Sequence, residues 1–327
     1  MVLETAPPGP DEDPPTLLSN AGRTEGGEDL VTFYKTPGYG AWDPSSVVMF
    51  SFAVFFAMIV SDGGYGLLLA LPLAHFWKRL GASSTGQRWR WVLLSLVVAT
   101  VGYGVLVGSY FGLSPDPGTF LGTLAVVDMS DTTFMMGISV TIGVLHVALA
   151  NLLDARRLGL TPAALAPAGW AGVMVGGYLV LLASLPGLDG LRTPGAGLAV
   201  VGLVLVLAFA GHGSRALGRM GKGLAALARL SQAFGDVLSY LRLFALGVAS
   251  ASLAVAFNGM AAGVRDAIPG VGLLLAITIL VVGHSLNLVL AVASGFIHGL
   301  RLNVIEFFNW GLPEEGSLFR PFRKKGG

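Results

Sequence analysis

Long apolar runs separated by short polar stretches occupy most of this chain. A bilayer-crossing helix needs ~20 predominantly apolar residues, so each run predicts one membrane-spanning helix. The runs, about eight in all, lie near 45–61, 64–77, 91–113, 133–153, 166–187, 194–211, 231–262 and 268–310. The first two are short and meet at 61–66, which predicts a tight helical hairpin or, alternatively, one kinked span. The last two runs are long. At ~1.5 Å per residue the final one reaches ~60 Å, twice the hydrocarbon thickness, so we expect strong tilt or projection into water.

The composition agrees with a membrane protein. Hydrophobic residues make up 54% of the chain and charged residues only 12%, with a mean hydropathy of +0.72. Soluble domains carry about 25% charged residues, so lipid must be the outer solvent of an all-α membrane fold. Cysteine is absent, which excludes disulfides and thiol chemistry. We divide the chain into an acidic, Pro/Gly-rich cytoplasmic segment with a pre-membrane linker (1–44), a transmembrane domain (45–310) and a basic cytoplasmic tail (311–327).

Basic residues mark alternate loops, as positive charge favours the cytoplasmic side in short loops. The basic residues that follow the second, fourth, sixth and eighth runs are Lys78, Arg79, Arg88, Arg90, Arg156, Arg157, Arg215, Arg219, Lys222, Arg229, Arg320, Arg323, Lys324 and Lys325. The other loops are poor in base, and the single arginines there, Arg192 and Arg265, each lie near an aspartate. This alternation predicts a multi-pass protein of the cell inner (plasma) membrane with both termini in the cytoplasm.

Four charged side chains lie inside the predicted spans: Asp236, Arg242, Arg301 and Glu306. A charge at mid-bilayer costs about 2.5–3.5 kcal/mol on insertion scales, so such residues usually mark a pathway or a pairing site. Structural ion pairs within the chain are the alternative. Asp236 and Arg242 are six residues apart and Arg301 and Glu306 five, whereas helical partners lie three or four apart. We therefore expect the two arginines to face a water-filled cavity or a carboxylate from another subunit.

Polar side chains accompany these charges in the last two spans. Hydroxyl, amide and imidazole groups can hydrogen-bond water or relay protons, and they are costly against lipid. The candidate lining of an ion path, taken from these spans and the first turn, is Asp62, Ser231, Gln232, Asp236, Ser239, Tyr240, His284, Asn287, His298 and Glu306. The imidazole of His298 could equally serve as a helix–helix hydrogen bond.

Several motifs resemble one family in sequence order. GDVLSYLRLFAL at 235–246 and HGLRLNVIEFF at 298–308 are similar to the signatures of the last two helices in subunit a (subunit I) of rotary V/A-type ATPases. DGGYG at 62–66 resembles the family's first hairpin and GSYFG at 108–112 its third span. YKTPGYG at 34–40, followed by Asp43-Pro44, resembles its pre-membrane linker. The resemblance covers the chain from about residue 34 to its end.

The resemblance implies a stator beside a rotating proteolipid ring whose subunits each bear one buried carboxylate. Arg242 and Arg301 would keep the passing carboxylate ionised, and offset half-channels would carry the ion, expected to be a proton, from each side. Other stator and stalk subunits are the implied partners. The family's large soluble N-terminal half has no counterpart before the first span, which leaves open a separate chain, a split form or a deletion.

The sequence lacks a phosphate-binding loop ending in Lys-Ser/Thr, so we expect a non-catalytic subunit of an ATP-driven complex. We expect no cofactor, no metal and no nucleic acid. Two alternatives stay open from the residues alone. One is a secondary transporter with a mid-membrane substrate site, which would predict an inverted repeat between 45–153 and 166–310. The other is a passive membrane anchor in which the arginines are merely structural.

Overall fold

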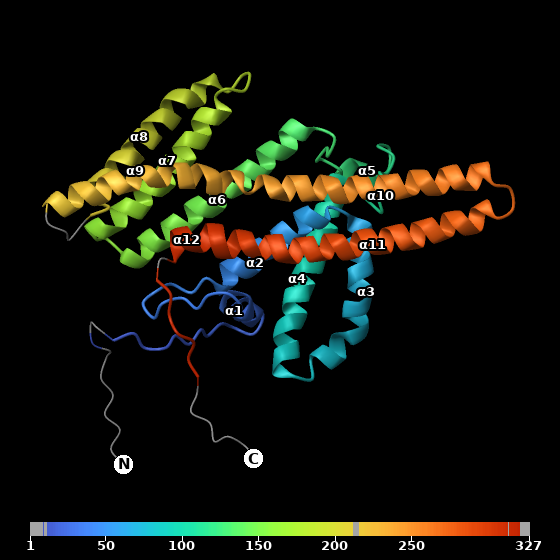
Figure 1. Ribbon diagram of the computed structural model, residues 1–327, viewed down its shortest axis with the longest axis horizontal. Coiled ribbons are helices and arrows are strands. Elements are labelled where there is room, and N and C mark those ends of the chain that lie inside the picture. Colours follow the sequence, from blue (N-terminus) through green and yellow to red (C-terminus); the bar gives the residue numbers. More distant parts are fainter. Residues whose placement is uncertain (1–8, 10–11, 212–215, 313, 321–327) are drawn as a thin grey trace, which may run out of the picture.

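The computed structural model describes residues 9, 12–211, 216–312 and 314–320, and throughout that part the regular elements are helices (Figure 1). Six helices are long and apolar enough to cross a membrane: Ser84–Val107, Thr132–Leu158, Pro162–Leu182, Asp189–Phe209, Ala228–Ala267 and Gly272–Gly311. The last two have 40 residues each. The predicted all-α membrane fold with a long final pair is therefore confirmed.

The elements follow the predicted runs in order, although α4 lies about seven residues before the predicted 91–113 and α9 begins 15 residues before 231. In chain order they are α1 (Glu25–Thr32), α2 (Ser45–Val60), α3 (Gly63–Leu80), α4 (Ser84–Val107), α5 (Phe120–Leu124), α6 (Thr132–Leu158), η1 (Pro162–Ala164), α7 (Leu165–Leu182), η2 (Asp189–Leu191), α8 (Arg192–Phe209), α9 (Ala216–Leu238), α10 (Leu241–Ala267), α11 (Gly272–Arg301), the π-helix η3 (Leu302–Phe307) and α12 (Phe308–Gly311). The two runs predicted as single long helices each contain one irregularity, between α9 and α10 and at η3.

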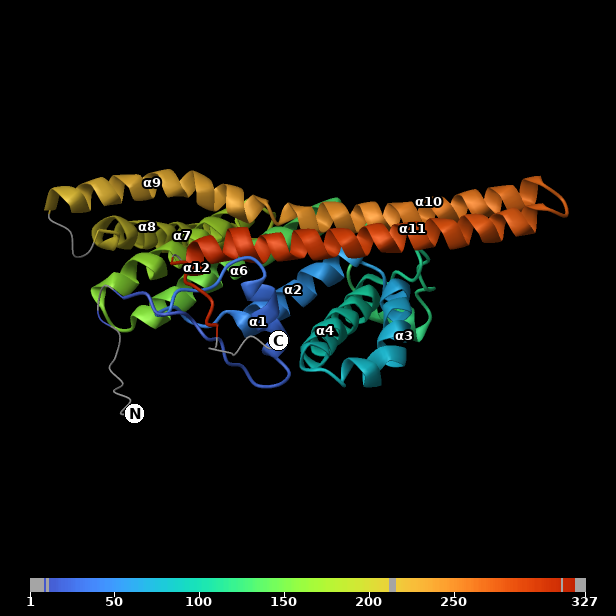
Figure 2. The same ribbon diagram turned by 60° about the horizontal axis from the view of Figure 1, so that its bottom comes forward.

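The first two runs form two separate helices, but they are not a tight hairpin. Val60 ends α2 and Gly63 begins α3, with Ser61 in the left-handed region (φ 51°) and Asp62 as the N-cap between them. From this turn the helices diverge (Figures 1 and 2), and α4 packs against both of them. The predicted hairpin was wrong because α4, which returns through the same layer, supplies the packing surface that each helix needs.

The long final pair lies along one side of the molecule. Figure 2 shows α9 and α10 beside α11 and α12 over the longest dimension, with α1 to α4 below them. The central α2 packs beneath this pair, where Phe56 lies against Gly295 and Phe52 against Gly299. A Cβ at Gly295 would lie 2.7 Å from the Phe56 ring, so the small residues of α11 permit the close helix contacts that bilayers favour.

The two described terminal segments lie on the same side of the helices. Thr16 pairs with Leu318 and Pro37 with Glu315 through isolated backbone bridges. We call this end of the molecule the terminal side and the end with the Asp62 turn the distal side. An even number of membrane crossings requires both ends of the chain to lie on the same side. Arg215, Arg323, Lys324 and Lys325, which belong to the predicted loop charges and basic tail, lie outside the described residues.

Candidate functional site

The two intramembrane arginines lie on the long helix pair, each beside an end of a regular helix. Arg242 is the second residue of α10, and Arg301 is the last residue of α11. The Arg242 side chain is half-buried, and its Nη1 is buried without a hydrogen-bond partner, whereas Arg301 is exposed. Among the described residues, no carboxylate stands at ion-pair distance from either guanidinium. Both charges are thus available to a group outside this chain.

A break in the helix precedes Arg242. Ser239 and Tyr240 separate α9 from α10, and the Arg242 and Leu243 amides donate to the carbonyls three residues earlier, a tighter turn than in an α-helix. Tyr240 is fully buried beside α6, where Gly143 leaves the space for its ring. A Cβ at Gly143 would lie 2.8 Å from that ring. The break therefore fixes the direction in which α10 carries Arg242.

A π-helix follows Arg301. Its geometry is held by Asn303, whose amide donates to the Gly299 carbonyl at 3.0 Å and whose side-chain oxygen accepts from Ser51 of α2. Residues five apart differ by about 140° around an α-helix, but a π turn brings them toward one face. Glu306 consequently lies near enough to Arg242 and Arg301 to interact electrostatically, although it is buried and its Oε2 has no hydrogen-bond partner.

The antiparallel register of α10 and α11 fixes the relative depth of the arginines. Asn258 bonds His284, and Gly283 lies against the Phe257 ring. Continuing this register toward the terminal side places Arg242 opposite residues 298–300, so Arg301 lies within one helical turn of the level of Arg242. Arg242 interacts electrostatically with Arg301, and His298 with both arginines. The His298 Nδ1 is buried and unpartnered beside the two guanidiniums, and we call Arg242 and Arg301 the cationic cluster.

Polar groups of four elements meet on the terminal side of this cluster. The Tyr240 hydroxyl and His146 Nδ1 are 2.7 Å apart, and His146 stacks on Phe307 with ring centroids 4.2 Å apart. Trp310 of α12 donates to Asp236 at 2.8 Å. We call His146, Asp236, Tyr240 and Trp310 the terminal-side network. It adjoins Glu306, whose charge acts on Tyr240.

A cavity of about 330 Å³ adjoins Trp310 between α6, α7, α9 and α12. Asn151, Asp154 and Arg229 contribute polar groups to its lining. Arg229 lies over the Trp310 ring at 4.4 Å from the centroid, and Arg157 holds Asp154 by an ion pair of 3.0 Å. The cavity therefore gives water room to reach the indole that bonds Asp236.

A second polar network lies toward the distal side. The Tyr65 hydroxyl is 2.8 Å from His284 Nδ1 and accepts from Asn287 at 3.0 Å. His284 Nε2 is 3.0 Å from Asn258 Oδ1, and the Asn258 amide donates to the Phe111 carbonyl. Tyr65, Asn258, His284 and Asn287 form the distal network. At ~1.5 Å per residue, Asn258 lies ~24 Å along α10 from Arg242, so the arginines separate the two networks.

Asp62 has a structural place in this arrangement. It is buried, and its two carboxylate oxygens accept hydrogen bonds from the Tyr65, Phe111 and Gly112 amides and from the Ser109 hydroxyl. These bonds tie the α2–α3 turn to the loop after α4. Loop groups bind both of its oxygens, so its charge joins two segments. The assignment of Asp62 to an ion path stays a prediction.

The other residues predicted to line the ion path, Ser231, Gln232 and Ser239, lie on α9 or at its end. Ser231 and Gln232 are exposed on α9, and Gln232 hydrogen-bonds Asp236. Ser239 donates to the Gly235 carbonyl at the helix break. The candidate lining left out Tyr65, His146, Asn258 and Trp310. Tyr65 is part of the DGGYG motif, and His146 and Asn258 are isolated polar residues in apolar runs, so features of the sequence could have identified all three. Only the fold could bring Trp310 to Asp236.

Comparison with known proteins finds relatives along almost the whole chain. It is 30% identical to the V-type ATP synthase subunit I of Chlamydia pneumoniae, over 99% of this chain and 57% of that protein. It is 32% identical to the A-type ATP synthase subunit I of Methanocaldococcus jannaschii, over 99% of this chain and 51% of that protein. It is 31% identical to the V-type ATP synthase subunit I 1 of Treponema pallidum, over 97% of this chain and 53% of that protein. The chain thus spans about half the length of these relatives, aligning to their C-terminal half. No protein-family model matches it.

Proposed function

Because the chain is homologous to subunit I of V/A-type ATP synthases over nearly its whole length, we propose that it forms the membrane stator of such a complex. In this role it carries protons between the aqueous phases and a rotating ring of proteolipid subunits. Nucleotide hydrolysis or synthesis takes place in other subunits. Other stator and stalk subunits complete the complex.

One observation carries the proposal: two guanidiniums, within one helical turn of each other in depth on the long helix pair, have no ion-pair partner among the described residues. A charge at membrane depth is retained where it meets a partner or water. Arginine stays protonated under these conditions, unlike lysine. A carboxylate ~4 Å from one guanidinium gains about 4 kcal/mol at an effective dielectric of ~20. That attraction keeps a ring carboxylate ionised as it passes Arg242 and Arg301.

The two polar networks suit two separate half-channels. We assign the terminal-side network, with its adjoining cavity, Glu306 and His298, to the cytoplasmic half-channel. The distal network of Tyr65, Asn258, His284 and Asn287 belongs to the opposite one. The cationic cluster between them repels protons and so prevents direct leakage. A proton must then leave one network on a ring carboxylate and reach the other by rotation. Both termini lie in the cytoplasm, as the loop charges favour.

The decisive experiment replaces Arg242 with glutamine in the assembled complex and measures ATP-driven proton pumping in vesicles. We expect pumping to fall to background, because the passing carboxylate would pick up a proton beside an uncharged amide. Arg265→Gln is the matched control: it lies on the same α10, is exposed and pairs with Asp266 at 3.0 Å. Intact pumping in an assembled Arg242→Gln complex would contradict the proposal and favour a passive anchor.

A further inference from the structure

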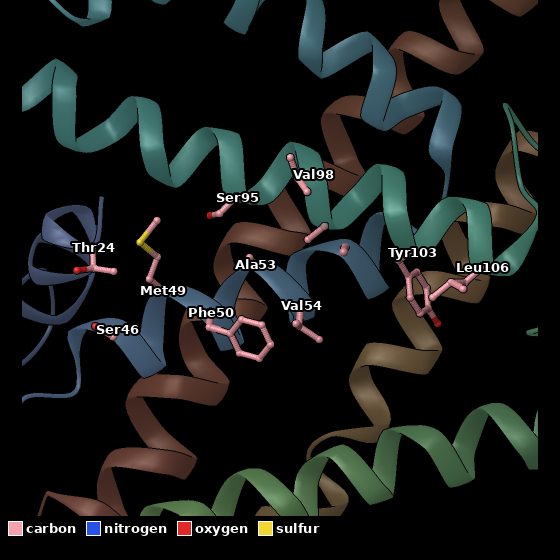
Figure 3. A pocket seen from close by; sticks show the side chains of 12 residues that line it. Thr24, Ser46, Met49, Phe50, Ala53, Val54, Ser95, Val98, Tyr103 and Leu106 are labelled. Carbon is pink, nitrogen blue, oxygen red and sulfur yellow. The ribbon is translucent and has the colours of Figure 1, made fainter. Parts of the chain in front are cut away.

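A long apolar groove runs between α2 and α4, on a different face of α2 from the arginine-bearing pair. Its volume is about 560 Å³ (Figure 3). It begins at Thr24 and Ser46 near α1 and ends at Tyr103 and Leu106 near the distal end of α4. Phe50 beside it is 73% exposed, so the groove opens sideways from the helices. Because α4 crosses the membrane, this opening faces the acyl chains of the bilayer.

The groove has the length of one leaflet. It extends from Ser46 to Ala57 on α2 and from Ser95 to Leu106 on α4. Each stretch is ~16 Å at ~1.5 Å per residue, and half of the ~30 Å hydrocarbon core is ~15 Å. Small side chains such as Ala53 and Ala99 form its floor. An acyl chain that enters at the terminal-side end would fill it to its far end.

Two arginines without an ion-pair partner among the described residues lie beside Trp91 near the terminal-side mouth, and Arg90 also lies 5.1 Å from the Trp77 ring of α3. The guanidiniums of Arg23 and Arg90 lie 5.1 and 5.7 Å from the ring centroid of the same side chain, Trp91. Neither forms an ion pair within the described part of the chain, and the buried Nε of Arg90 lacks a hydrogen-bond partner. The nearby acids Glu25, Glu28 and Asp29 of α1 are bound to Arg88.

This combination selects a class of ligand. Tryptophan and arginine at a helix end typify the bilayer interface, and basic pockets between membrane helices bind anionic headgroups. An apolar protein segment would fill the groove but would leave the two guanidiniums near its mouth without a counter-ion. We propose that the groove binds one anionic phospholipid of the leaflet on the terminal side. One acyl chain fills the space between α2 and α4, and the phosphate lies against Arg23 and Arg90.

Native mass spectrometry of the full chain tests this proposal. The protein is reconstituted in nanodiscs of equal phosphatidylglycerol and phosphatidylcholine with identical acyl chains, and is then released with its tightly bound lipid. We expect one retained phosphatidylglycerol, about tenfold preferred over phosphatidylcholine. The double variant Arg23→Gln/Arg90→Gln should abolish the preference. Arg156→Gln, an exposed arginine at the terminal-side end of α6, should leave it unchanged.

A variant that fills the groove tests the binding of the acyl chain separately from the binding of the headgroup. Ala99→Phe puts a ring into the groove and should remove retained lipid of both classes. Gly197→Phe, on α8 away from the groove and with no atom within 4 Å of a Cβ, should not. Photo-cross-linking of wild-type protein with a diazirine on the phosphatidylglycerol chain needs no variant, and it should label 46–57 and 95–106.

Three outcomes would overturn the proposal. Equal retention of phosphatidylglycerol and phosphatidylcholine would show that the arginines do not bind the anionic headgroup. Label outside the two helices, or lipid retained in Ala99→Phe, would place the lipid elsewhere. A dimer that Ala99→Phe dissociates would make the groove a contact between two copies of the chain.

Discussion

Two buried carboxylates, Asp62 on the distal side and Glu306 on the terminal side, meet opposite conditions. Asp62 accepts four hydrogen bonds from the turn and loop that it joins. Glu306 keeps one oxygen without a partner and interacts electrostatically with Arg242 and Arg301. A buried charge whose acceptors are all bonded holds structure together, whereas one that is only partly bonded can exchange protons or partners. Charge at membrane depth alone does not distinguish these two roles.

The largest effect on stability should come from Asp62→Ala. The change removes the N-cap of α3 and leaves the Phe111 and Gly112 amides without acceptors, so we expect unfolding to become easier by about 3 kcal/mol or more. Thermal unfolding of the purified chain in detergent measures this loss. Asp116→Ala, in the exposed loop after α4, should change little. Equal losses from the two variants would show that Asp62 is not the joint between the segments.

Glu306→Gln should separate stability from transport. Glutamine has nearly the same shape, so we expect a stability change within about 1 kcal/mol and at least a tenfold loss of ATP-driven proton pumping in the assembled complex. The comparison is sharpest when Asp62→Asn is measured beside it. If Glu306→Gln unfolded the protein as readily as Asp62→Asn, the contrast between the two carboxylates would fail.

Gly143→Ala should disturb the helix break before Arg242. The new methyl would lie 2.8 Å from the Tyr240 ring and 3.0 Å from the Val237 carbonyl, an overpacking that costs about 1–3 kcal/mol. Gly137→Ala, on the same α6 with no atom within 4 Å, is the control and should be neutral or stabilising by up to about 1 kcal/mol. Thermal unfolding gives both values, and a stable Gly143→Ala protein would mean that Tyr240 can move without cost.

Tyr240→Phe should have the smallest effect. It removes the hydroxyl that bonds His146, which leaves that buried ring nitrogen unsatisfied at a cost of about 1–2 kcal/mol. Tyr110→Phe is the matched control, because the Tyr110 hydroxyl is buried without a partner and its loss should cost nothing. The difference in unfolding free energy between the two variants tests whether the Tyr240–His146 bond stabilises the protein.

Much of this architecture follows from the sequence because lipid imposes simple rules. Helices must satisfy their own backbone in a bilayer, so apolar runs of sufficient length gave the positions of the spans. The cost of charge at depth singled out Arg242 and Arg301. The motifs around both arginines and around Asp62 indicated the family to which the comparisons then led.

The tertiary structure decided which polar groups meet. Hydropathy does not show that α4 separates α2 from α3, because every apolar face fits any other about equally well in lipid. Nor does spacing along a regular helix describe Glu306, since the π-helix that brings it toward Arg301 depends on Asn303 and Ser51 from different elements. The role of Asp62 rests on amides 49 and 50 residues away. Local patterns fix the helices, and contacts between distant segments fix which charges are bound and which remain free.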